Sequence, residues 1–127
     1  YYAESREIRL AALVAMGRSA DEQWFEFLFE QLHSDDAEFR MEAATACGEI
    51  LSEDAFEALT ETLLDEDPEV TFAAIAAIGE IGGPQAVSIL DTFKEEADAD
   101  FEDAIVLARE QAQERKGREA TSDEDDW

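Results

Sequence analysis

The pattern of apolar and polar positions repeats every 31 residues along most of the chain. When the sequence is shifted by 31 residues against itself, the apolar residues Ile8, Phe39, Val70 and Phe101 coincide, and no insertion is needed. Small residues keep the same register: Gly17, Gly48 and Gly79, and Ala15, Ala46, Ala77 and Ala108. Self-similarity at a fixed period of this length indicates an array of one repeated supersecondary unit.

Each unit contains two stretches with helical periodicity. Between residues 68 and 81 the apolar residues recur at three- and four-residue spacing, which places them on one face of a helix. Asp67 is suited to cap this helix and Pro68 to start it, and Gly82–Gly83 is suited to end it. The same signals predict helices at 5–18, 22–33, 37–50, 53–64, 68–81, 84–96 and 99–115.

A single 31-residue helical hairpin cannot bury its own apolar face, so neighbouring hairpins must bury it jointly. We therefore predict an all-α, right-handed α-α superhelix (solenoid) of about three and a half hairpins, with Ile8, Phe39 and Val70 in matching interior places. The repeat domain is expected at 1–116, followed at 117–127 by an acidic disordered tail. Because the first helix lacks a partner helix, we expect the domain to be the C-terminal part of a longer array.

The stretch "DPEV…AAIAAIGEIGGPQAV" resembles the HEAT-like repeat, the type also found in phycobilisome (bilin) lyase subunits, and the resemblance covers about residues 5–115. In that family a basic residue follows the apolar anchor; Arg9 and Arg40 match this pattern, whereas Thr71 and Glu102 depart from it. The resemblance implies an Asp–Arg ladder between repeats, kept here only in the N-terminal half. It also implies that the alanine-rich helices line the concave surface.

The charge balance restricts the class of partner. The 127 residues include 34 acidic and 9 basic side chains, for a net charge of −25. Such a chain is repelled by nucleic-acid phosphates and by anionic membranes, so we expect neither as a partner. No uncharged run is long enough for a transmembrane helix. The single cysteine, Cys47, excludes an internal disulfide and is consistent with a cytoplasmic protein.

Candidate catalytic residues are sparse. His33, the only histidine, falls at a helix end, where a surface role is expected. Cys47 takes the place that Met16 and Ile78 occupy in neighbouring units, so we expect a core residue and not a nucleophile. Acidic clusters at 35–36, 65–67 and 98–103 could hold cations weakly, but none has the twelve-residue loop with a central glycine. We expect a non-enzyme without a cofactor or a dedicated metal site.

Opposite the core face of the alanine-rich helices, large apolar residues coincide in the repeat register. Leu10, Met41 and Phe72 would form an apolar row about 20 Å long if helix axes lie about 8–10 Å apart. Val14, Thr45 and Ala76 follow on the same side, and Glu42, Glu49 and Glu80 would form an acidic rim. Exposed apolar rows typically mark binding sites, so we predict a non-catalytic scaffold that binds a basic or neutral protein or peptide. The alternative is that adjacent repeats cover this row, which would then be ordinary core.

Glutamates four residues apart form an acidic ridge on the other helices: Glu22, Glu26, Glu30, Glu53, Glu57 and Glu61. Such like-charge pairs each cost a helix about 0.2–0.5 kcal/mol. The ridge is either a docking face for a basic partner or an adaptation to high salt or for solubility. The resemblance also permits an accessory or chaperone-like subunit of a bilin lyase-type enzyme. A monomer is expected, and a homodimer through an edge carrying Trp24 and Phe27 is the alternative.

Overall fold

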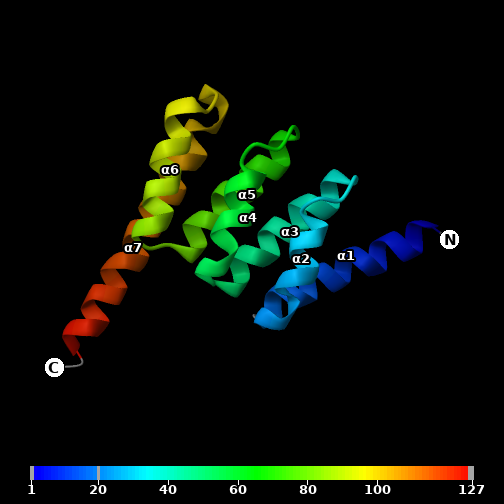
Figure 1. Cartoon of the computed structure of the whole chain (residues 1–127), viewed down its shortest axis with the longest axis horizontal. Coiled ribbons are helices and arrows are strands. Elements are labelled where there is room, and N and C mark those ends of the chain that lie inside the picture. The colour runs from blue at the N-terminus through cyan, green and yellow to red at the C-terminus, as the bar shows by residue number, and fades with distance from the viewer. Residues whose placement is uncertain (1, 20, 126–127) are drawn as a thin grey trace.

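The computed structural model describes the backbone of residues 2–19 and 21–125, and the side chains of residues 5–19, 21 and 23–114. Within these residues the regular structure is entirely helical (Figure 1). The elements are α1 (Tyr2–Ser19), η1 (Glu22–Trp24), α2 (Phe25–Gln31), α3 (Ala37–Ile50), η2 (Glu53–Ala55), α4 (Phe56–Thr62), α5 (Pro68–Ile81), α6 (Pro84–Glu96), η3 (Ala99–Phe101) and α7 (Glu102–Asp125). Each helix expected from the sequence is present, and three of the expected helices begin with a short 3₁₀ turn.

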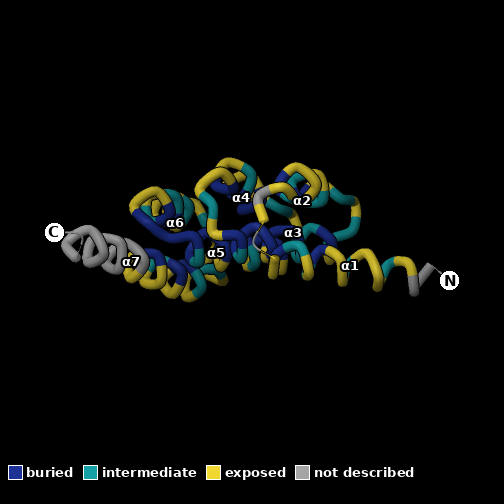
Figure 2. Tube along the Cα trace, turned by 90° about the horizontal axis from the view of Figure 1, so that it is seen from below, coloured by how far each residue is buried: buried dark blue, intermediate teal, exposed yellow. Residues whose placement is uncertain are grey.

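The helices form two layers that run along the length of the molecule. Helices α1, α3, α5 and α7 lie side by side in one layer, here called the odd layer. Helices α2, α4 and α6 form the second layer, here called the even layer, and buried residues lie between the two (Figure 2). This arrangement confirms the predicted all-α solenoid. Its handedness stays a prediction.

The helix ends follow local sequence signals. Asp36 caps α3 and Asp67 caps α5, because each carboxylate accepts a hydrogen bond from the backbone N–H two residues later. Helix α5 ends at Gly82 and Gly83, whose φ angles of 71° and 90° are accessible to glycine at little cost. At the equivalent end of α3, Leu51 has a φ of 61°, in the left-handed region that disfavours side chains.

The glycines and alanines that coincide in the repeat register form one contact repeated along the odd layer. A Cβ added to Gly48 would lie 2.8 Å from both the Cα and the Cβ of Ala77, closer than real Cβ atoms approach. The equivalent distances to the alanine Cα are 2.7 Å for Gly17 and Ala46, and 2.9 Å for Gly79 and Ala108. The missing side chain therefore allows adjacent odd helices to pack backbone against backbone.

One predicted core residue is exposed. Phe39 and Val70 lie in the core, as predicted, but Ile8 is 69% exposed, so the prediction for Ile8 is wrong. The reason is the even helix that would cover Ile8. Helix α2 packs on α3 and α4 packs on α5, whereas no helix in the described part of the chain packs on α1 in this way. The repeat register fixes which face a residue lies on. Its burial also requires a neighbouring helix.

The C-terminal segment continues the last helix, and the acidic disordered tail at 117–127 stays a prediction. Helix α7 continues through Asp125, so the backbone of residues 117–125 is helical, and Asp126 and Trp127 lie outside the described residues. The first half of α7 is anchored by the buried Ala108 and Ala112. Residues 113–116 and 118–119 are all Gln, Glu, Arg or Lys, which favour continuation of a helix beyond Ala112. The domain boundary at 116 stays a prediction.

Candidate functional site

The apolar row predicted from the repeat register lies on the odd layer and is partly exposed. Leu10 and Met41 are half-buried, and Phe72 keeps 39% of its surface exposed. The Phe72 ring meets the ring of Phe101 edge-on, with 4.8 Å between the centroids, which fixes its position. Of the residues expected to follow on the same side, Val14 is half-buried, and Thr45 and Ala76 are exposed. The row is therefore held by packing yet reachable from solvent.

The acidic rim is half-buried. Burial raises the pKa of Glu42, and the nearby charges of Glu38 and Glu49 raise it further. Burial likewise raises the pKa of Glu80, with a contribution from Glu49. Among the described residues, no Lys, Arg or His forms an ion pair with Glu42, Glu49 or Glu80. The rim therefore concentrates negative charge that its own surroundings leave uncompensated.

Two rungs of an arginine–aspartate ladder connect the repeats in the N-terminal half. Arg40 donates to both carboxylate oxygens of Asp65, at 2.8 and 3.2 Å, and to the carbonyl oxygen of Ser34 at 2.8 Å. Both side chains of this pair are mostly buried. In the next unit Thr71 replaces the arginine, and its hydroxyl donates to the carbonyl oxygen of Asp65 at 3.3 Å.

The first rung uses a different arginine from the one the family pattern indicates. Arg6 donates to both oxygens of Asp36, at 2.9 and 3.1 Å, and lowers the pKa of that carboxyl group. Arg9, which matches the family pattern, instead lies over the ring of Phe39, with 4.8 Å from its guanidinium carbon to the ring centroid. The expectation that Arg9 belongs to the ladder is therefore wrong, because Ser34 stands in register with Asp65 and the aspartate two residues later, Asp36, pairs with Arg6.

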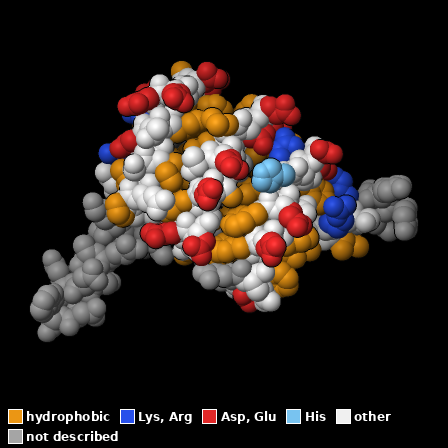
Figure 3. Space-filling view, viewed as in Figure 1, with side chains coloured by type: hydrophobic (Ala, Val, Ile, Leu, Met, Phe, Trp, Pro, Cys, Tyr) orange, Lys and Arg blue, Asp and Glu red, His pale blue; other side chains and the backbone are white. Residues whose placement is uncertain are grey.

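The acidic ridge lies on the free surface of the even layer. Its members Glu26, Glu30, Glu53, Glu57 and Glu61 are exposed, and the side chain of Glu22 lies outside the described residues. Figure 3 shows carboxylates spread over this face, with apolar surface exposed between them. His33 is also exposed, with its Nε2 atom 3.9 Å from a carboxylate oxygen of Glu61.

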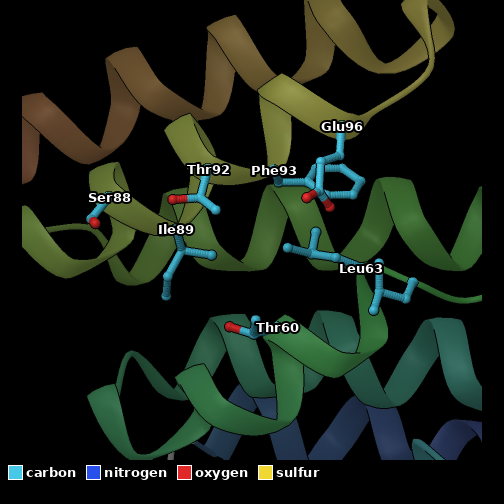
Figure 4. Close-up of a pocket in the computed structure, with 8 residues that line it drawn as sticks. Thr60, Leu63, Ser88, Ile89, Thr92, Phe93 and Glu96 are labelled. Atoms are coloured by element: carbon cyan, nitrogen blue, oxygen red, sulfur yellow. The ribbon is translucent and has the colours of Figure 1, made fainter.

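A pocket between α4 and α6 was not predicted from the sequence. It has a volume of about 280 Å³ and is lined by Thr60, Leu63, Leu64, Ser88, Ile89, Thr92, Phe93 and Glu96. Figure 4 shows Thr60 on α4 and Ile89 and Thr92 on α6, on opposite sides of the opening. The repeat register holds a signal that could have found it: Leu64 occupies the position of His33, and Thr92 that of Glu61.

Cys47 and the acidic clusters are the remaining candidates for a nucleophile or a metal site. Cys47 is buried in the core, as predicted, and burial raises the pKa of Cys47 to about 12, so its thiol stays protonated. Among the residues the structure describes, no three His, Cys, Asp or Glu side chains gather closely enough to hold a metal ion. In the same part of the chain, no helix is both long enough and apolar enough to cross a membrane.

Comparison with known families agrees with this architecture. The family model described as HEAT repeats matches residues 2–65 and 25–109, which together span most of the chain. A comparison with curated proteins finds no match. HEAT repeats are generally protein-interaction scaffolds, and the family is generally non-catalytic. The two-layered stack of helical hairpins and this match show that the chain belongs to the HEAT-repeat family.

Proposed function

We propose that the chain binds a protein or peptide on the odd layer, with the apolar row as its contact surface. The observation that carries the proposal is Phe72, a large aromatic side chain that stays 39% exposed on a solvated face. Met41 and Leu10 extend the apolar surface across the two preceding units. Burial of one partner side chain of this kind stabilises a complex by roughly 1.5–3 kcal/mol.

The acidic rim supports a basic partner. Glu42 and Glu80 lie in half-buried positions, where burial and the nearby charge of Glu49 raise the pKa of both carboxyl groups. A lysine or arginine placed beside them gains from that field and relieves the repulsion between the carboxylates. A partner that combines apolar side chains with flanking basic residues matches both features of the surface.

The close packing of the odd helices supports a concave binding face. Adjacent odd helices meet through glycine–alanine contacts, whereas the described even helices pack mainly on the odd layer and not on one another. A two-layered array that is tighter on one side curves toward that side. We infer that the odd layer is concave, so that a partner segment would contact several units at once.

The test immobilises the unmodified chain and Phe72→Ala and compares the proteins that each captures from an extract of the cells that make the chain. Phe27→Ala is the matched control, because Phe27 is 42% exposed but lies on the even layer. We expect Phe72→Ala to lose partners that the unmodified chain and Phe27→Ala both retain, with all three chains still folded by circular dichroism. Equal capture by Phe72→Ala would remove the apolar row from the proposal.

A further inference from the structure

We propose that the pocket between α4 and α6 is a second docking site, which takes an apolar anchor side chain from a basic amphipathic helix of a partner protein. The pocket opens on the even layer, whereas the apolar row of the proposed function lies on the odd layer. The two proposals therefore rest on different residues and can fail separately.

The pocket is shaped for an anchor side chain. Its walls combine the apolar side chains of Leu63, Leu64, Ile89 and Phe93 with hydroxyl groups from three polar residues. Its volume of about 280 Å³ falls just below the roughly 300–1,000 Å³ of pockets that hold drug-sized ligands. Leu64 is 75% exposed, so this wall loses water when a partner covers it.

Comparison with the preceding unit shows what is special about this pocket. Between α2 and α4, the equivalent positions include the charged or titratable residues His33, Glu57 and Glu61, and His33 of one helical hairpin lies near Glu61 of the next. Between α4 and α6, Leu64 replaces the histidine and Thr92 replaces the glutamate. Ser88 likewise stands where the preceding unit has Glu57. The row of ridge glutamates therefore stops at α6, where Leu64, Ser88 and Thr92 line the opening and Glu96 is the acidic residue among its lining residues.

Charge selects the occupant. Glu96 lines the pocket, Glu57 and Glu61 are exposed on the same helix as Thr60, and no lysine or arginine is among the lining residues. A helix that places one apolar residue in the pocket would bring its flanking residues over these carboxylates, which favours lysine and arginine there. A second copy of this chain carries a net charge of −25 and is repelled. The opening between two helices suits a helical segment with apolar residues at three- and four-residue spacing.

The test uses a synthetic helical peptide of about 15 residues, with leucines at that spacing and lysines elsewhere. Two control peptides have the lysines replaced by glutamate, or the leucines replaced by alanine. Binding to the full chain is followed by amide chemical shifts. We expect shifts for Leu63, Leu64, Ile89 and Phe93 with the lysine–leucine peptide, and weaker binding as salt screens the carboxylates.

Two leucine-to-serine variants show how much the pocket contributes to the affinity for the peptide. Leu64→Ser should weaken the lysine–leucine peptide by about tenfold, whereas Leu107→Ser, which alters a similarly exposed leucine on α7, should leave its affinity unchanged. The proposal is overturned if Leu64→Ser binds as tightly as the unmodified chain, or if the shifts map only to the odd layer. It is also overturned if the alanine peptide binds equally well, because adsorption to the acidic ridge would then account for the binding.

Discussion

At the scale of single residues, Glu80 shows how a half-buried charge opposes folding. Its carboxylate lies against Gly48, where an added Cβ would come within 3.3 Å of an Oε2 atom, and burial there raises its pKa. The residue was predicted to lie on the rim of a binding face. Its distance from the backbone of the neighbouring helix could not be predicted, because the glycine–alanine contact sets that distance.

The raised pKa of Glu80 predicts how stability depends on pH. The folded state holds this proton more strongly than the unfolded state, whose reference pKa is 4.5. As the pH falls from 7 through the raised folded value toward about 4.5, protonation of Glu80 therefore adds stability. Glu80→Gln should stabilise the chain at pH 7 and reduce the gain on acidification, measured by urea unfolding at pH 7 and pH 5.

Glu57→Gln is the control for this experiment, because it removes the same charge from an exposed position on α4. It should change the pH dependence less than Glu80→Gln does. An equal change in both variants would attribute the effect to net charge and not to the position of Glu80.

At the scale of helices and turns, the sequence predicted most of the structure. The apolar period located each helix, and Asp67, Pro68 and the Gly82–Gly83 pair predicted both ends of α5. The end of α3 was placed correctly at residue 50, but the left-handed conformation of Leu51 was not predicted, although Leu51 stands in register with Gly82. Where a glycine is absent from a helix end, local sequence does not reveal which residue takes the strained position.

Leu51→Gly should stabilise the chain by about 0.5–1 kcal/mol, since glycine adopts the left-handed conformation without a Cβ clash. Leu51 is 41% exposed, and the loss of its remaining contacts offsets part of the relief of strain, which limits the expected gain. Urea unfolding measures the difference. Leu64→Gly is the control, because Leu64 is exposed and has no positive φ, and it should lower stability. If Leu51→Gly also lowers stability, the left-handed backbone of Leu51 does not destabilise the chain.

At the scale of the whole molecule, the repeat register predicted the stack but not its edges or gaps. The interior places of Phe39 and Val70 followed from the register. The exposure of Ile8 depends on which helices surround α1. Arg9 lacks an aspartate partner because Ser34 stands in register with Asp65, the partner of Arg40. The pocket between α4 and α6 also escaped prediction, although the replacement of His33 by Leu64 and of Glu61 by Thr92 is visible in the register.

The most direct test of the stacked array is the effect of Gly48→Ala on the free energy of unfolding, with Thr45→Ala on the exposed side of the same helix as the control. In a helix with open space, a change from glycine to alanine stabilises by roughly 0.5–1 kcal/mol. Here the new Cβ would lie 2.8 Å from Ala77, so we predict a loss of about 1–3 kcal/mol instead. Thr45→Ala should give a small gain, because alanine has the higher helix propensity. A gain in stability for Gly48→Ala would contradict the glycine–alanine contact and, with it, the packing of the odd layer.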